Sequence, residues 1–181
     1  MKTKRKNIFK SLLALTLALI MVLGVAPISE LAGVDWASLF APKAEAVEQK
    51  TYGIYTYEVS EDNTVTITRC DKSANGAITI PSKIGGKPVT YIGGWAFNGC
   101  TGITSIIIPN SVTIIGDGAF NNCAGLTSIT IPDSVTSIGE SAFCGCTSLK
   151  SINVVSDNDC FSSDNGVLFD KKKTKLIRYP E

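Results

Sequence analysis

Cysteines are the residues of this chain with the most varied chemistry, and half of them are evenly spaced. Three of the six recur at intervals of 23 residues, at Cys100, Cys123 and Cys146, and the others are Cys70, Cys144 and Cys160. Thiols can form disulfides or bind zinc. Zinc is disfavoured because the one close pair, Cys144-x-Cys146, is spaced too tightly and the chain contains no histidine.

Disulfides are equally hard to build from the evenly spaced cysteines. If each 23-residue unit stacks on the next, the Cα atoms of these cysteines lie about 4.8 Å apart, which is within bridging range. Three thiols in one column cannot all pair, however, and side chains that point the same way fit the bridge geometry poorly. We therefore expect free thiols that pack as small buried hydrophobic groups. A Cys144–Cys160 bridge is the alternative.

The absence of histidine excludes the common hydrolytic sites. The chain can assemble no Ser-His-Asp or Cys-His pair and no HExxH motif. Gly94–Gly99 has the glycine spacing of a phosphate-binding loop, but Cys100-Thr101 follows it instead of Lys-Ser or Lys-Thr. Paired carboxylates could hydrolyse glycosides, yet the candidates fall at predicted turns: Asp62, Asp117, Asp133 and Glu140. The sequence predicts no enzyme, no catalytic residue and no cofactor.

A segment rich in Asp and Asn near the C-terminus is a candidate metal site. Asp157-Asn158-Asp159 and Asp164-Asn165-Gly166 could offer oxygen ligands to calcium. The glycine and the distal bidentate glutamate of an EF-hand are missing, so an Asx-rich loop without metal is favoured. The nearby run Lys171-Lys172-Lys173 indicates a solvated turn rather than a binding patch.

The N-terminus carries the features of an export signal. Basic residues between Lys2 and Lys10 precede an uncharged run of 16 residues, Ser11–Ala26. A helix that crosses a membrane needs about 20 apolar residues, so this run is short for a permanent anchor. Ala44-Glu45-Ala46 supplies the small residues that signal peptidase selects, which predicts a signal peptide with a long c-region over 1–46. An uncleaved anchor is the alternative, and in both cases the rest of the chain is exported.

From Val89 the sequence restarts every 23 residues, in the units 89–111, 112–134 and 135–157. The first two units are identical at 15 of 23 positions without a gap. A fixed period of this length is typical of a solenoid, in which each coil buries its apolar face against its neighbours. The fold class is therefore predicted to be mostly β, with one coil per unit.

Columns of identical residue types define the expected coil. Apolar residues two apart, as in Ile106-x-Ile108, indicate a strand with one buried face, and stacked coils would pair these strands in parallel. Two further columns should fill the interior: Phe97, Phe120 and Phe143, and then Ile92, Ile115 and Ile138. A glycine follows each isoleucine of the second column, at Gly93, Gly116 and Gly139, where a turn with positive φ is expected. Pro109 and Pro132 should end their strands.

The segments on either side of these units predict a partial coil and two caps. Ala77–Pro81 matches the strand element and is followed by an insertion, Ser82–Pro88, so the solenoid is expected over 77–157. Residues 47–76 should form an N-terminal capping hairpin, from Tyr52–Ser60 and Thr64–Cys70. Residues 158–181 should form a second hairpin or spacer, from Gly166–Asp170 and Leu176–Tyr179.

One pattern is repeated between Ile78 and Asp157: Ile-Gly-x-x-Ala-Phe-x-x-Cys-x-x-Leu-x-x-Ile-x-Ile-Pro-x-x-Val. This pattern resembles the BspA-type leucine-rich repeat of bacterial surface and secreted proteins. The tail Phe161–Pro180 is similar to a spacer found between such repeats. The resemblance implies a right-handed leucine-rich-repeat solenoid, surface exposure and, for some members, adhesion to host proteins or other cells. In the family further repeats usually follow this tail, so the end at Glu181 suggests a truncated product or a fragment.

Function is then expected to depend on the surface of the solenoid. Residues flanking the inward positions of the strands should face outward as a binding face or as plain solvent-tolerant positions: Ser105, Ile107, Ser128, Thr130, Ser151 and Asn153. We expect an exported interaction module, secreted or at the cell surface, that binds an extracellular protein or glycan. A structural spacer, or the N-terminal fragment of a larger surface protein, is the alternative. A net charge of +1 does not indicate the basic surface that nucleic-acid binding needs.

Overall fold

The computed structural model describes residues 49–179, and this range contains strands but no helix. Ala46–Glu181 form one compact unit around a continuous apolar core, so we expect this unit to fold on its own. Between residues 49 and 179 no helix is long and apolar enough to cross a membrane. The predicted signal peptide and c-region, residues 1–46, lie outside the described residues.

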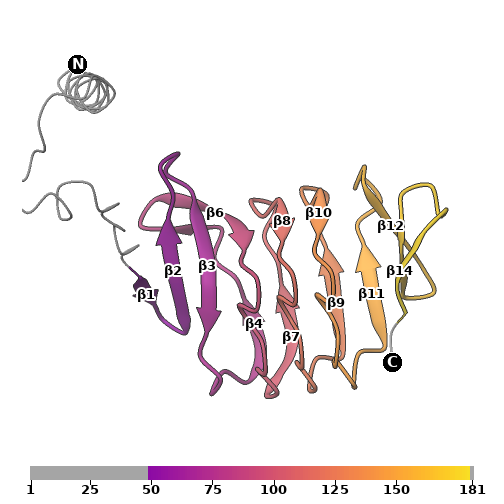
Figure 1. Ribbon diagram of the computed structural model, residues 1–181, viewed down its shortest axis with the longest axis horizontal. Coiled ribbons are helices and arrows are strands. Elements are labelled where there is room, and N and C mark those ends of the chain that lie inside the picture. The colour runs from indigo at the N-terminus through magenta and orange to yellow at the C-terminus, as the bar shows by residue number, and fades with distance from the viewer. Residues whose placement is uncertain (1–48, 180–181) are drawn as a thin grey trace, which may run out of the picture. The chain divides into compact units, whose positions relative to one another are not determined.

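A seven-stranded sheet runs through the unit in the order β1-β2-β3-β6-β8-β10, with β5 paired to β6 at its side (Figure 1). Its strands are β1 (Lys50–Tyr52), β2 (Tyr55–Val59), β3 (Val65–Cys70), β5 (Lys83–Ile84), β6 (Lys87–Ile92), β8 (Ile114–Ile115) and β10 (Ser137–Ile138). The first three strands pair antiparallel. From β3 onward along the main path the pairs are parallel, as stacked coils require.

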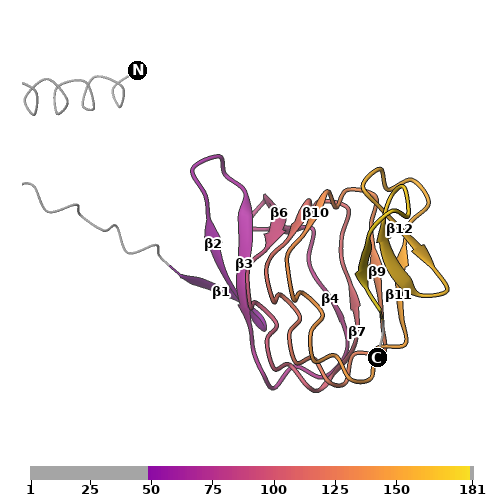
Figure 2. The ribbon, with the colours of Figure 1, turned by 45° about the vertical axis from the view of Figure 1, so that its right-hand side comes forward.

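A four-stranded sheet, in the order β11-β9-β7-β4, forms the other side of the coils (Figure 2). It consists of β4 (Gly76–Thr79), β7 (Ile103–Ile107), β9 (Ser128–Ile131) and β11 (Ser151–Val154). All its pairs are parallel, and each residue of β9 pairs with the residue 23 positions later in β11, as Ser128 does with Ser151. This register confirms the predicted solenoid of 23-residue coils.

Apolar columns fill the space between the two sheets, as the repeat predicts. Phe97 and Phe120 lie with ring centroids 5.1 Å apart, and Phe143 stacks on Phe120 at 5.7 Å. Ile92 and Ile115 are fully buried as well, whereas Ile138 in the last coil is half-buried against the core. Because every column continues from coil to coil, each coil depends on its neighbours for its core.

The glycines after the isoleucine column have a different role from the one expected. Gly93, Gly116 and Gly139 do not have positive φ, so the prediction of a left-handed turn at these positions was wrong. Their constraint is the distance between coils. A Cβ on Gly116 would lie 2.6 Å from the Gly94 nitrogen, and one on Gly139 would lie 2.4 Å from the Asp117 nitrogen. Only glycine lets the backbones of successive coils approach so closely.

This contact predicts a large difference between two neighbouring glycines. Gly116→Ala forces backbone atoms apart and should lower the free energy of unfolding by about 2 kcal/mol or more, in the range known for overpacking. Gly94→Ala is the matched control, because its Cβ would meet nothing closer than the Asp117 carbonyl oxygen, at 3.2 Å. Chemical denaturation of both variants measures the difference. Equal losses would show that contact between the coil backbones does not explain the glycine column.

A hairpin lies at the N-terminal end of the solenoid and a three-stranded antiparallel sheet at its C-terminal end. The β2–β3 hairpin joins the stack directly, since β3 pairs in parallel with β6. The insertion after Pro81 forms a small hairpin, β5–β6, whose turn uses the positive φ of Gly85 and Gly86. At the C-terminus a three-stranded antiparallel sheet consists of β12 (Phe161–Asp164), β13 (Val167–Asp170) and β14 (Leu176–Arg178). The strands β1, β5, β6, β8, β10 and β12 have no counterpart in the sequence-based expectation.

Candidate functional site

The six predicted binding-face residues lie on the four-stranded sheet in two columns. Its register aligns Ser105, Ser128 and Ser151 in one column, and Ile107, Thr130 and Asn153 in the other. The serines are half-buried, whereas all three residues of the second column are exposed. Thr79 of β4 pairs with Ile107 and extends the exposed column by one strand. The structure therefore brings the predicted residues together on one face.

This sheet face is uncharged along its central column and contains one large apolar group. The side chain of Ile107 is 61% exposed, which is the highest exposure of any described isoleucine. Thr104, Thr127 and Lys150 flank the columns and are also exposed. The Thr127 hydroxyl donates a hydrogen bond to the Thr104 carbonyl at 3.0 Å, so the threonines join neighbouring coils. The two columns themselves can form van der Waals contacts and neutral hydrogen bonds, and Lys150 is the one charged group among these flanking residues.

The C-terminal hairpins limit where a partner can bind. The Ile152 amide donates to the Gly166 carbonyl at 2.8 Å, and the Val154 amide donates to the Ser163 hydroxyl at 3.1 Å. These bonds satisfy amides on the outer edge of β11, which protects that edge from pairing with another strand. A partner should therefore bind the face of this sheet rather than extend it at β11.

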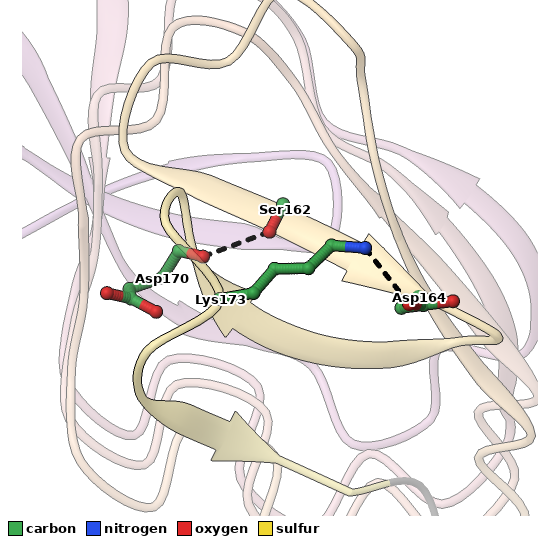
Figure 3. Close-up of polar contacts among 4 residues, drawn as sticks. All are labelled: Ser162, Asp164, Asp170 and Lys173. Atoms are coloured by element: carbon green, nitrogen blue, oxygen red, sulfur yellow. Dashed lines mark hydrogen bonds and ion pairs between the residues drawn. The ribbon is translucent and has the colours of Figure 1, made fainter.

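Two polar contacts join residues within the tail (Figure 3). The Ser162 hydroxyl donates to the Asp170 carbonyl across β12 and β13 at 2.9 Å, and Lys173 pairs with Asp164 at 2.9 Å. Lys171 also donates to the carbonyls of Ser156 and Asn158. The lysine run is exposed, as expected for a turn, but Lys171 fastens the tail to the chain before it, whereas Lys173 pairs with a residue of the tail itself.

All six cysteines are free thiols, so the alternative Cys144–Cys160 bridge is not formed. Cys100, Cys123 and Cys146 are buried in one column. The Cys123 thiol donates to the Phe97 carbonyl and the Cys146 thiol to the Phe120 carbonyl, both at 3.1 Å. Each thiol thus binds the backbone of the preceding coil. Burial raises the pKa of Cys123 to about 12, which keeps its thiol protonated and poorly nucleophilic at neutral pH.

Cys70 begins this column, although its spacing from Cys100 conceals the fact. The interval is 30 residues, because the seven-residue insertion Ser82–Pro88 adds to the 23-residue period. Both sulfur atoms approach the Asp71 carbonyl oxygen, at 3.6 Å for Cys70 and 3.8 Å for Cys100. The hydrogen bond from Cys70 to Cys100 raises the pKa of Cys70 and lowers that of Cys100.

Asn158 argues against a calcium site at the C-terminal Asx-rich segment. Its side chain is fully buried, and its amide nitrogen donates to the carbonyls of Pro132 and Val135 at 2.8 and 2.9 Å. Its amide oxygen accepts from the backbone of Cys160 and Phe161 at 2.8 and 2.7 Å. Across residues 49–179 no cluster of three metal-binding side chains is found. Asn158 is a structural cap that the sequence did not reveal as such.

The acidic residues considered for catalysis lie in turns, as the sequence indicates. Hydrogen bonds from Ser60 and Thr64 lower the pKa of Asp62. Asp117 accepts a hydrogen bond from the Glu140 amide at 2.9 Å, which joins two coils. The carboxylates of Asp62 and Asp117 therefore have structural partners.

A family model for the BspA-type leucine-rich repeat region matches residues 71–179, with six copies of the repeat. The chain therefore belongs to this family. It is similar to the solved leucine-rich repeat protein of T. pallidum, with a TM-score of 0.53 and 34% identity over 58% of this chain and 49% of that one. A leucine-rich repeat protein from Bacteroides ovatus matches with a TM-score of 0.52 and 38% identity, over 58% of this chain and 29% of that one.

This chain thus spans about half the length of the T. pallidum protein and under a third of the Bacteroides ovatus protein. No curated protein matches the chain.

Proposed function

We propose that the chain is an exported interaction module that binds an extracellular protein through the exposed face of the four-stranded sheet. The observation that carries the proposal is the alignment of Ile107, Thr130 and Asn153 in one exposed column. Solenoid repeat proteins use such extended faces for partners. A protein is favoured over a glycan at this face because Ile107 is apolar and the column is uncharged.

Secretion or display at the cell surface is part of the same proposal. The N-terminal signal sequence predicted from residues 1–46 and membership of the BspA-type family both support it. We assign the chain no catalytic role, because histidine is absent from the sequence and the carboxylates of Asp62 and Asp117 have structural partners.

A binding screen tests this function. Purified residues 46–181 would be applied to arrays of extracellular-matrix proteins, cell-surface proteins and glycans. We expect saturable binding to at least one protein, with a dissociation constant in the micromolar range or below. The three to four coils offer an area of at most about 800 Å² to a partner, which is the size of a standard interface. A well-folded domain that binds none of these proteins would favour the structural spacer instead.

A further inference from the structure

A second candidate site lies where the N-terminal hairpin meets the first coil. A hollow of about 620 Å³ opens there between β2, the end of β3 and the turn of the first coil that contains Trp95. Its volume is typical of ligand sites. The buried residues Tyr55, Cys70 and Ala96 are among those that line it. The hollow depends on this junction, so it does not recur along the solenoid.

Trp95 is an unusual residue for its position in the coil. Its φ is +61°, and the equivalent positions in the next coils, Gly118 and Ser141, have φ of +59° and +55°. The left-handed region suits glycine and is strained for a bulky side chain. Trp95 is also 55% exposed, so burial of its indole does not offset this strain. A strained and exposed tryptophan at a position that holds glycine and then serine in the next coils points to a function.

The indole is held flat against the neighbouring coil. A Cβ on Gly118 would lie 2.9 to 3.0 Å from three fused-ring atoms of Trp95, which places Gly118 over the face of the ring. The ring therefore packs against Gly118 while Trp95 also lines the hollow on the N-terminal side. An aromatic face held in this way is a stacking platform for a flat or apolar ligand surface.

The net positive charge around the hollow favours an anionic ligand. Arg69 and Lys72 line it and are exposed. The single lining carboxylate, Asp71, accepts hydrogen bonds from the amide and hydroxyl of Ser73, both at 2.9 Å and both on Oδ1. One positive charge therefore remains for a ligand carboxylate. Cationic ligands, which also favour tryptophan faces, are repelled by the same two residues.

The remaining lining groups favour a sugar over a peptide. Thr51, Thr56 and Asn98 add hydroxyl and amide groups that can bind ligand hydroxyls, and Oδ2 of Asp71 can accept from another. A peptide anchor generally needs a well-packed apolar pocket, whereas this hollow is open and mainly polar with one aromatic platform.

We propose that this hollow binds a carboxylate-bearing sugar residue of an acidic glycan. The sugar ring stacks on Trp95, and its carboxylate pairs with Arg69 and Lys72. This site goes beyond the protein-binding face proposed above and uses none of its residues, so each site can fail without the other.

Tryptophan fluorescence tests the proposal directly, because Trp95 is the single tryptophan of residues 46–181. The probes are trigalacturonate and sialyllactose, with methyl-esterified trigalacturonate and lactose as uncharged counterparts. We expect a saturable change in emission with at least one acidic probe, and at least tenfold weaker binding of its counterpart. If neither acidic probe binds, or if an esterified or neutral probe binds equally well, the proposal is overturned.

Two variants and one control locate the binding. By calorimetry, Trp95→Gly should abolish binding yet still fold, because glycine occupies the equivalent position in the next coil. Arg69→Gln with Lys72→Gln should weaken binding of the acidic probe at least tenfold, while Ile107→Lys with Thr130→Lys should leave it unchanged. Full binding by a folded Trp95→Gly variant would overturn the proposal. So would tighter binding of an N-acetylated triglutamate peptide, which would make the hollow a peptide site.

Discussion

Phe120→Ala should lower the free energy of unfolding by about 3–5 kcal/mol, the usual loss for a buried aromatic side chain. Phe120 is fully buried and lies between the rings of Phe97 and Phe143, at 5.1 and 5.7 Å. Its removal leaves a cavity in the middle of the column and takes a stacking partner from both neighbouring coils. Because coils are stable only through their neighbours, the loss should affect cooperative unfolding of the whole stack.

Urea denaturation followed by circular dichroism measures this loss. Thr130→Ala is the control, since Thr130 is exposed on the four-stranded sheet and should change stability by no more than about 0.5 kcal/mol. A Phe120→Ala variant as stable as the control would contradict the packing of the coils through this column.

Asn158→Ala should cost about 3 kcal/mol or more, because it removes four hydrogen bonds from a fully buried side chain. The carbonyls of Pro132 and Val135 and the amides of Cys160 and Phe161 lose their partners together. The tail after Asn158 should then be released from the last coil. Limited proteolysis, together with thermal unfolding, would detect both effects.

Two further substitutions separate this capping role from metal binding. Asp157→Ala changes an exposed neighbour and should be nearly neutral. Asn158→Asp keeps an acceptor but loses the donor to Pro132 and Val135, so it should also destabilise. If Asn158→Asp were neutral, or stabilised by added calcium, the capping role would be wrong and a metal site would return.

The repeat made much of the fold predictable. Its 23-residue period fixed which residues stack, so the phenylalanine column and the outward position of Ile107, Thr130 and Asn153 followed from spacing alone. Alternation along the chain identified β7, β9 and β11 because these strands are long enough to show it. The two-residue strands β8 and β10 are too short for any alternation, and their pairing depends on the neighbouring coils.

Other features depend on contacts that no local pattern shows. Gly116 is required by the backbone of the preceding coil, which lies 23 residues away in sequence. Cys70 joins the thiol column only when the seven inserted residues are subtracted from its spacing. Asn158 follows Val135 by one period and could have been found by continuing the repeat one step further. Trp95 was hidden because its φ and its contact with Gly118 become visible only in the structure.

The most direct test of the proposed binding face compares two matched double variants. Ile107→Lys with Thr130→Lys changes the outer face of the four-stranded sheet in two successive coils. Ile114→Lys with Ser137→Lys changes exposed, paired positions of the seven-stranded sheet in the same way, with one isoleucine and one hydroxyl residue replaced. Both variants carry the same added charge.

Surface plasmon resonance against the protein partner found in the screen would measure the affinity of each variant. We expect the first to weaken binding at least tenfold, because it places two charges in the centre of the interface, and the second to bind as the native domain does. Equal affinities for the two folded variants, or loss of binding only in the second, would contradict the assignment of the interaction face.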